Sequence, residues 1–255
     1  MYVCVECGSS VPYLYREYSA QNLRLAACSK CHQIADKYIE WETQMVLIDL
    51  ILNRPEAYRH ILFNRGHANR MSKEIIKFLT VIFAFDSFDR WYLNSAQVPL
   101  PNSAASVVAS PVGVFTRWLL PHEHQWIILL TSLGETAIYI SSIFLGSRLY
   151  LHSAWGKYNY NSRSLMSAIV LSCFSKLGVL LWMVWDAQYH HRIGIELFTL
   201  LSNVVAVTVF IGNQSAWGSR VSFPAVMIVA TAFFLRCLFG YYMSEVQPAI
   251  HFHVF

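Results

Sequence analysis

Residues 126–145 read WIILLTSLGETAIYISSIFL, and Glu135 is the only charged residue among these twenty. A helix needs about 20 mainly apolar residues to cross the hydrocarbon core of a bilayer. Three further runs are similarly long and apolar, at residues 165–185, 193–211 and 221–243. Because a strand of a membrane barrel needs only about ten residues of alternating polarity, these lengths predict an all-α, polytopic transmembrane helix bundle.

A fifth run, residues 75–93, is a weaker candidate for a membrane span. It carries Lys77 near its start, and Asp86, Asp89 and Arg90 toward its end. Only residues 78–85 within it are free of charge and continuously apolar apart from one threonine. The run is therefore either a true span or an interfacial or re-entrant helix, and the sequence predicts four or five spans.

The charges divide the chain into two parts. Of 255 residues, 55% are hydrophobic and 13% are charged, and the mean hydropathy is +0.38. Residues 1–74 hold 9 basic and 8 acidic residues, whereas residues 75–255 hold 10 and 7 over more than twice the length. We expect a small N-terminal domain, residues 1–65, and a multi-pass membrane domain, residues 66–255. A net charge of +1 in the first part argues against a nucleic-acid partner, because phosphate binding needs a concentrated basic patch.

Four of the six cysteines form two pairs, Cys4-x2-Cys7 and Cys28-x2-Cys31, separated by twenty residues. This spacing fits a zinc ribbon with four thiolate ligands, at the edge of the usual range of spacings. Such a site is structural, because four protein ligands leave no open coordination position for catalysis. Two disulfides or four unrelated thiols are the alternatives. The apolar and polar residues that alternate at 11–15 and 23–25 predict a small hairpin between the two pairs.

The segment after the second pair is unusually apolar for a soluble domain. We expect a strand leaving the ribbon, then a helix through residues 46–52, which read VLIDLIL. Pro55 should end that helix and begin another, because proline is favoured in the first turn of a helix. Residues 46–52 either lie at a membrane surface or pack on the ribbon.

Two CxxC pairs followed by ADKYIE (35–40), VLIDLIL (46–52) and RPEAYRHILFN (54–64) closely resemble the Arv homology domain. That domain opens the Arv family of endoplasmic-reticulum sterol-homeostasis proteins. The resemblance covers residues 1–65 and implies a multi-pass reticulum protein that mediates sterol distribution, with sterol and other membrane lipids as partners. It also implies effects on sphingolipid metabolism and on glycosylphosphatidylinositol (GPI) precursors. The alternative is an adaptor whose zinc ribbon recruits or regulates a membrane enzyme of lipid or GPI synthesis.

Basic residues outside the runs predict the orientation of the chain. With five spans and a cytosolic N-terminus, 13 of them lie on the cytosolic side and 3 on the other. Basic residues favour the cytosolic side of membrane proteins. The reducing cytosol is also the compartment in which four thiolates stay free to bind Zn²⁺.

Charged residues also lie inside the four strong runs: Glu135, Lys176, Glu196 and Arg236. A lone charge at the centre of a bilayer costs about 2.5–3.5 kcal/mol on insertion scales, so each needs a partner or a polar cavity. Their depths permit the ion pairs Glu135–Lys176 and Glu196–Arg236. These pairs could join helices, line a polar pocket for a lipid hydroxyl or head group, or act in acid–base catalysis. No catalytic set of residues accompanies them, so we do not expect an enzyme.

Overall fold

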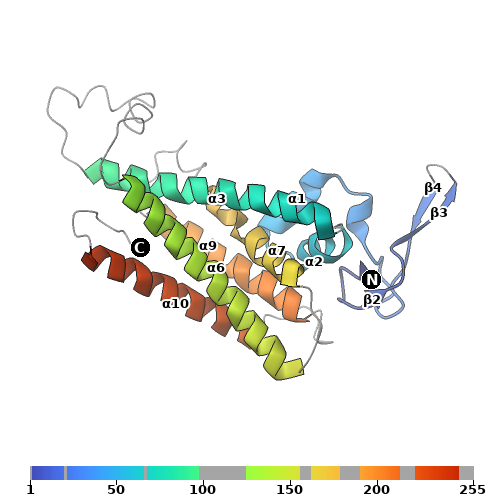
Figure 1. The fold of residues 1–255 in the computed structure, drawn as a ribbon. Coiled ribbons are helices and arrows are strands. Elements are labelled where there is room, and N and C mark those ends of the chain that lie inside the picture. The colour runs from blue at the N-terminus through green and yellow to red at the C-terminus, as the bar shows by residue number, and fades with distance from the viewer. Residues whose placement is uncertain are drawn as a thin grey trace, which may run out of the picture.

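The computed structural model describes residues 2–19, 22–65, 68–97, 125–155, 162–178, 190–212 and 222–246. These residues are mostly helical. Long helices form a bundle, and a small region that contains the strands lies at the end of the bundle where α6 ends and α10 begins (Figure 1).

The N-terminal region contains two small antiparallel sheets. In one, β1 (Tyr2–Val3) pairs with β2 (Ser10–Val11). In the other, β3 (Tyr15–Ser19) and β4 (Asn22–Leu25) form a hairpin with an irregularity near its tip. The expected hairpin is therefore present, but its first strand begins only at Tyr15, because Val11 pairs with Tyr2 instead.

The strand that we expected after the second cysteine pair is not formed. The 3₁₀ turn η1 (Lys37–Ile39) lies there instead. Asp36 precedes this turn, and its Oδ1 accepts a hydrogen bond from the main-chain N–H of Tyr38 at 3.0 Å. The chain turns here because the buried side chain of Asp36 caps the residues that follow it.

Two short helices complete the N-terminal region. They are α1 (Thr43–Ile51) and α2 (Pro55–Arg59), and α2 continues into the π-helical turn η2 (His60–Asn64). As expected, Pro55 begins the second helix, at its first position. Asn53 turns the chain between the helices with a φ of 55°, a left-handed conformation that asparagine tolerates better than most residues.

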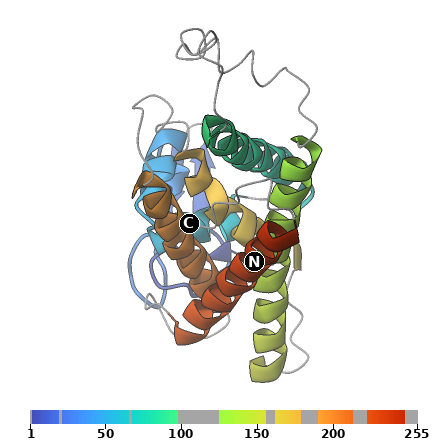
Figure 2. The ribbon, with the colours of Figure 1, turned by 90° about the vertical axis from the view of Figure 1, so that its left-hand side faces the viewer.

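The bundle consists of the remaining described segments. They are α3 (Ala68–Gln97), α6 (Gln125–Trp155), α7 (Ser162–Ser172) with the 3₁₀ segment η3 (Cys173–Gly178), α9 (His190–Gly212) and α10 (Phe223–Val246). Viewed from the far end of the bundle, α10 lies between α6 and α9 (Figure 2), and it packs on both. Gly134 eases the close approach of α6 to α10, because a Cβ atom there would lie 2.8 Å from Cζ of Phe239 and this ring would have to shift.

Three helices of the described part are long and apolar enough to cross a membrane: Trp126–Ser153, Ile193–Gly212 and Phe223–Met243. They coincide with three of the four strong runs. The fourth, residues 165–185, begins as α7 and η3, and its last residues, 179–185, lie outside the described residues. The weaker run at 75–93 lies within α3. The total of four or five spans stays a prediction.

One apolar cluster connects the N-terminal region to the bundle. It contains Val5, Tyr38 and Tyr58 from the first 65 residues, and Ala168 and Ala206 from α7 and α9. The hydroxyl of Tyr58 also lies 2.6 Å from Oγ of Ser202 in α9. The N-terminal region thus packs directly on the bundle. A boundary between two domains at residue 65 stays a prediction.

Candidate functional site

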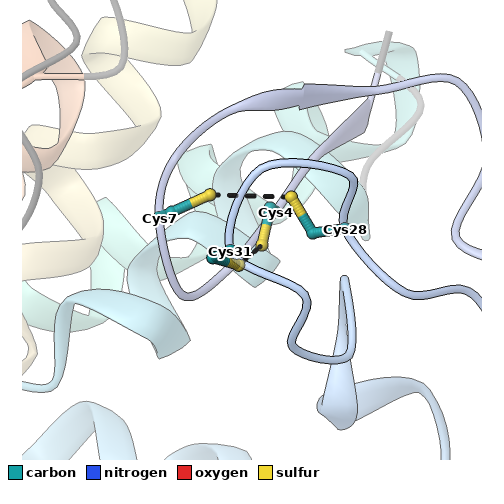
Figure 3. A group of neighbouring side chains, drawn as sticks. All are labelled: Cys4, Cys7, Cys28 and Cys31. Carbon is teal, nitrogen blue, oxygen red and sulfur yellow. Dashed lines mark hydrogen bonds between the residues drawn. The ribbon is translucent and has the colours of Figure 1, made fainter.

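The four paired cysteines converge on one point (Figure 3). Their sulfur atoms all lie within 4.8 Å of one another. Cys4 and Cys31 are 3.7 Å apart at their sulfurs, as are Cys7 and Cys28. In a tetrahedral zinc–thiolate site with Zn–S bonds of about 2.3 Å, neighbouring sulfurs are about 3.8 Å apart. The cluster therefore has the ligand type and spacing that Zn²⁺ requires, and all four cysteines are free thiols rather than disulfides.

The two cysteine pairs fold into matching loops. In the first, the N–H of Gly8 donates to the carbonyl of Cys4 at 2.9 Å. In the second, the N–H of His32 donates to the carbonyl of Cys28 at 3.0 Å. Gly8 and His32 both have a left-handed φ, 75° and 58° respectively. Each loop thus needs positive φ directly after its second cysteine, and only the first loop has glycine there.

Burial and hydrogen bonds make the thiols unequal. Burial raises the pKa of the Cys4 thiol to about 12 and also raises the pKa of Cys31. Burial acts in the same direction on Cys7, but hydrogen bonds with the side chain and main chain of Ser9 outweigh it and lower the pKa of Cys7 to about 6. Cys7 therefore loses its proton more readily than Cys4 or Cys31, and a metal that binds those two sulfurs displaces their protons.

Arg59 in α2 holds the first cysteine loop. Its Nη1 donates to the carbonyl of Val5 at 2.6 Å and to the carbonyl of Glu6 at 3.0 Å. Val5 and Glu6 are the two residues between Cys4 and Cys7, and the arginine is buried. The side chain thus fixes the backbone that presents both sulfurs, as partners beyond the ligands do in many metal sites.

A second set of polar contacts fixes the strand that leads into Cys4. The carboxylate of Asp36 is fully buried, and its Oδ2 lies 2.7 Å from Nδ1 of His60 and accepts from Nδ2 of Asn64 at 2.7 Å. The same Asn64 amide donates to the carbonyl of Val3 at 2.8 Å and accepts from its N–H at 2.9 Å. These residues attach η2 to both sides of the cysteine cluster.

The sequence alone did not assign roles to Asp36, Arg59, His60 or Asn64. All four lie in the quoted segments that carry the family resemblance. The available signal was the RHILFN segment itself, in which Arg59, His60 and Asn64 flank three apolar residues. Their partners are main-chain atoms or residues more than twenty positions away, which no local pattern reveals.

A chain of six charged side chains, joined by five ion pairs, crosses the bundle. It begins at Lys176, whose Nζ lies 2.8 Å from Oδ1 of Asp86. Asp86 pairs with Arg90 at 3.1 Å, and Arg90 binds both carboxylate oxygens of Glu135 at 2.8 and 2.6 Å. The chain continues from Glu135 to Nε of Arg236 at 3.3 Å.

At the end of this chain, Arg236 binds both carboxylate oxygens of Glu196 at 2.9 Å. The expected Glu196–Arg236 pair is therefore confirmed. The expected Glu135–Lys176 pair is wrong, since Glu135 pairs with the two arginines and Lys176 with Asp86. That expectation compared only the four strong runs and left out Asp86 and Arg90, which lie four residues apart on α3 and therefore on one helix face.

The six charges sum to zero, and each has at least one oppositely charged partner. Ser132 donates a further hydrogen bond to Asp86 at 2.8 Å. Pairing of this kind offsets the cost of removing charges from water. The arrangement favours contacts between helices over acid–base catalysis, because each charge is already held by a partner.

The comparisons with known proteins cover the cysteine loops and extend beyond them. The family model described as the Arv1-like family matches residues 3–207. The chain is 34% identical to "Protein arv1 homolog" of Dictyostelium discoideum over 98% of both chains. It is 31% identical to "Protein arv1" of Schizosaccharomyces pombe over 96% of this chain and 89% of the relative. With "Protein ARV1" of Homo sapiens it shares 27% identity over 96% and 83%. No solved structure gives a significant match.

Proposed function

The chain belongs to the Arv1-like family, and from this premise we propose that it mediates intracellular sterol homeostasis. In this proposal it takes part in distributing sterol, and also sphingolipid or GPI precursors, from the endoplasmic reticulum. Family membership over residues 3–207 is the observation that carries the proposal. Three helices long and apolar enough to cross a membrane are consistent with a protein that acts on membrane lipids.

We propose that Cys4, Cys7, Cys28 and Cys31 hold one structural Zn²⁺. When bound, the ion supplies a cross-link between the two cysteine loops. Hydrogen bonds within the chain position the remaining parts: Arg59 holds the first loop, and Asn64 holds the strand before it. Because Tyr58 of the same segment contacts Ser202 in α9, an ordered cysteine cluster also fixes how α1 and α2 lie on the bundle.

In this arrangement the N-terminal region positions the α1–α2 segment, and the bundle provides the membrane-embedded surface. The paired charges in the bundle join α3, α6, η3, α9 and α10. We assign them to holding the helices together. We propose an endoplasmic-reticulum membrane location with the N-terminus in the cytosol, where the thiolates stay reduced.

Deletion and complementation in a sterol-synthesising cell test the proposed function. Deletion should enrich the endoplasmic reticulum in sterol and slow the arrival of new sterol at the plasma membrane. The full chain should restore both. A Cys28→Ser variant should fail, whereas a Cys237→Ser variant, which alters a thiol outside the cluster, should restore them. Normal sterol distribution in the deleted cell would overturn the proposal.

An adaptor role is a second candidate function, and one exposed surface favours it. The β3–β4 hairpin projects away from the bundle (Figure 1) and exposes Tyr15, Tyr18 and Leu23. Exposed tyrosines are typical of protein–protein contact sites. An adaptor should retain a lipid- or GPI-synthesising enzyme when it is purified from its native membrane, and a Tyr15→Ser, Tyr18→Ser variant that still holds zinc should lose it.

A further inference from the structure

Helix α1 has two apolar faces, and the described part of the protein covers only one of them. Val46, Asp49 and Leu50 point inward and are buried. The outward side chains are large and apolar, and between 46% and 59% of each is exposed: Met45, Leu47, Ile48, Ile51 and Leu52. We call these five residues the α1 face. Large contiguous apolar surfaces of this kind mark contact with another molecule or with lipid.

The position of α1 on the bundle places this face at the depth of the membrane. Helix α1 packs on α2, and α2 packs on α9. The Tyr58 hydroxyl in α2 lies 2.6 Å from Ser202, which is the tenth of the twenty residues in the candidate span Ile193–Gly212. If α9 crosses the bilayer, the tip of Tyr58 lies near the middle of that crossing. The α1–α2 pair therefore lies alongside the bundle and not above it.

The residues that flank the α1 face suit a membrane interface. Trp41 is exposed just before α1 and packs edge-on against Tyr38, with ring centroids 5.2 Å apart. Exposed arginines lie at the two ends of the helix: Arg65 donates to Thr43 at 3.4 Å, and Arg54 follows α1 and pairs with Asp49 at 3.3 Å. Tryptophan and basic side chains are enriched where apolar segments meet lipid head groups.

We propose that the α1 face inserts into the acyl region of the leaflet nearest the N-terminal region, so that residues 43–64 form a lipid-embedded helix pair that does not span the bilayer. Lipid is the occupant because the bilayer that surrounds the bundle already reaches this depth. The neighbouring span α9 also exposes large apolar side chains, such as Leu197 and Leu201. The proposal depends on the membrane bundle and not on sterol as the cargo.

Photolabelling of the full chain in vesicles tests this proposal. The vesicles contain phosphatidylcholine with a small fraction of a phosphatidylcholine that carries a diazirine at the end of one acyl chain. Peptides that contain residues 43–52 should be labelled about as strongly as peptides from Phe223–Met243, whose Met227 and Phe234 are exposed on a candidate span. The β3–β4 hairpin is the internal reference and should be labelled several-fold less. Labelling of residues 43–52 at the level of the hairpin overturns the proposal.

Two matched variants sharpen the test. Ile48→Glu places a carboxylate on the α1 face, and Tyr18→Glu places one on the similarly exposed hairpin. Zinc content identifies preparations in which the N-terminal region is folded. In such preparations Ile48→Glu should lower the labelling of residues 43–52 several-fold, and Tyr18→Glu should leave it unchanged. Equal labelling in both variants contradicts lipid insertion, as does crosslinking of the α1 face to a protein partner in place of lipid. If Ile48→Glu does not fold, the labelling map of the unaltered chain decides the question by itself.

Discussion

Arg59 donates a 2.6 Å hydrogen bond to the main-chain carbonyl of Val5, although 54 positions separate the two residues in the sequence. This bond ties helix α2 to the loop that presents Cys4 and Cys7. Through the same helix, Tyr58 reaches Ser202 in the bundle. The cysteine cluster and the membrane helices are therefore two ends of one connected structure.

Replacing Arg59 should weaken metal binding without removing a ligand. Arg59→Met leaves the carbonyls of Val5 and Glu6 without this donor, and loss of such a supporting contact typically lowers metal affinity about 10–100-fold. Arg54→Met is the matched control, because Arg54 is half exposed and lies away from the cysteine loops. Competition with a zinc chelator, measured on the purified full chain, should separate the two variants. Equal affinities would show that Arg59 does not support the loop.

The two cysteine loops offer a test of backbone strain. His32 adopts a φ of 58°, which costs about 1–2 kcal/mol in residues other than glycine. We expect His32→Gly to stabilise the N-terminal region by about 1 kcal/mol and Gly8→Ala to destabilise it by a similar amount. Chemical denaturation of the zinc-loaded protein, followed by loss of bound metal, measures both. Destabilisation by His32→Gly, or stabilisation by Gly8→Ala, would contradict the assignment of both loops to one backbone geometry.

Removing one partner of the Glu196–Arg236 ion pair should destabilise the protein more than replacing both partners with neutral residues. Arg236→Met leaves the half-buried Glu196 carboxylate without its arginine. Loss of one partner of a fully buried pair typically costs about 3–5 kcal/mol, and the partial exposure of Glu196 should make the loss here smaller. The double variant Glu196→Gln, Arg236→Met removes both charges and should recover much of that stability, because Arg90 still holds Glu135. Thermal unfolding in detergent compares the two. A double variant as unstable as the single one would mean that the pair does more than neutralise charge.

Helix packing provides a prediction that is independent of charge. A side chain at Gly134 would collide with Phe239 of α10, whereas a Cβ atom at Gly194 meets nothing within 4 Å. Gly134→Leu should therefore destabilise the bundle by about 1–3 kcal/mol through overpacking, and Gly194→Leu should be tolerated. Thermal unfolding midpoints in the same detergent give the comparison. A shift in the Gly194→Leu variant as large as that in Gly134→Leu would contradict the packing of α6 on α10.

The sequence predicted the features that depend on spacing along the chain. Two residues between paired cysteines were enough to predict a cluster, and Pro55 was enough to place the start of α2. Features that depend on distant partners were not accessible. Lys176 could be matched to Glu135 by depth, but its actual partner, Asp86, lies on a helix that sequence reasoning treated as marginal. The depth of a residue in a bilayer says nothing about which neighbouring helix it faces.

The same limit explains the misplaced strand near Asp36. Its carboxylate is buried because His60 and Asn64 lie opposite it, and those residues follow two helices later. We expected a strand here, but long-range hydrogen bonds to Asp36 hold a turn in its place. The family resemblance identified these segments but did not show which contacts their residues make.

Photolabelling of the protein with a sterol is the most direct test of the proposed function. The full chain is purified with its zinc, incubated with a photoreactive sterol and irradiated, with unlabelled sterol as the competitor. We expect labelling of the protein that unlabelled sterol suppresses. We also expect that Cys28→Ser lowers this labelling and that Cys237→Ser does not. Labelling that sterol cannot compete, in a preparation that retains one zinc per chain, would contradict direct sterol handling and favour the adaptor.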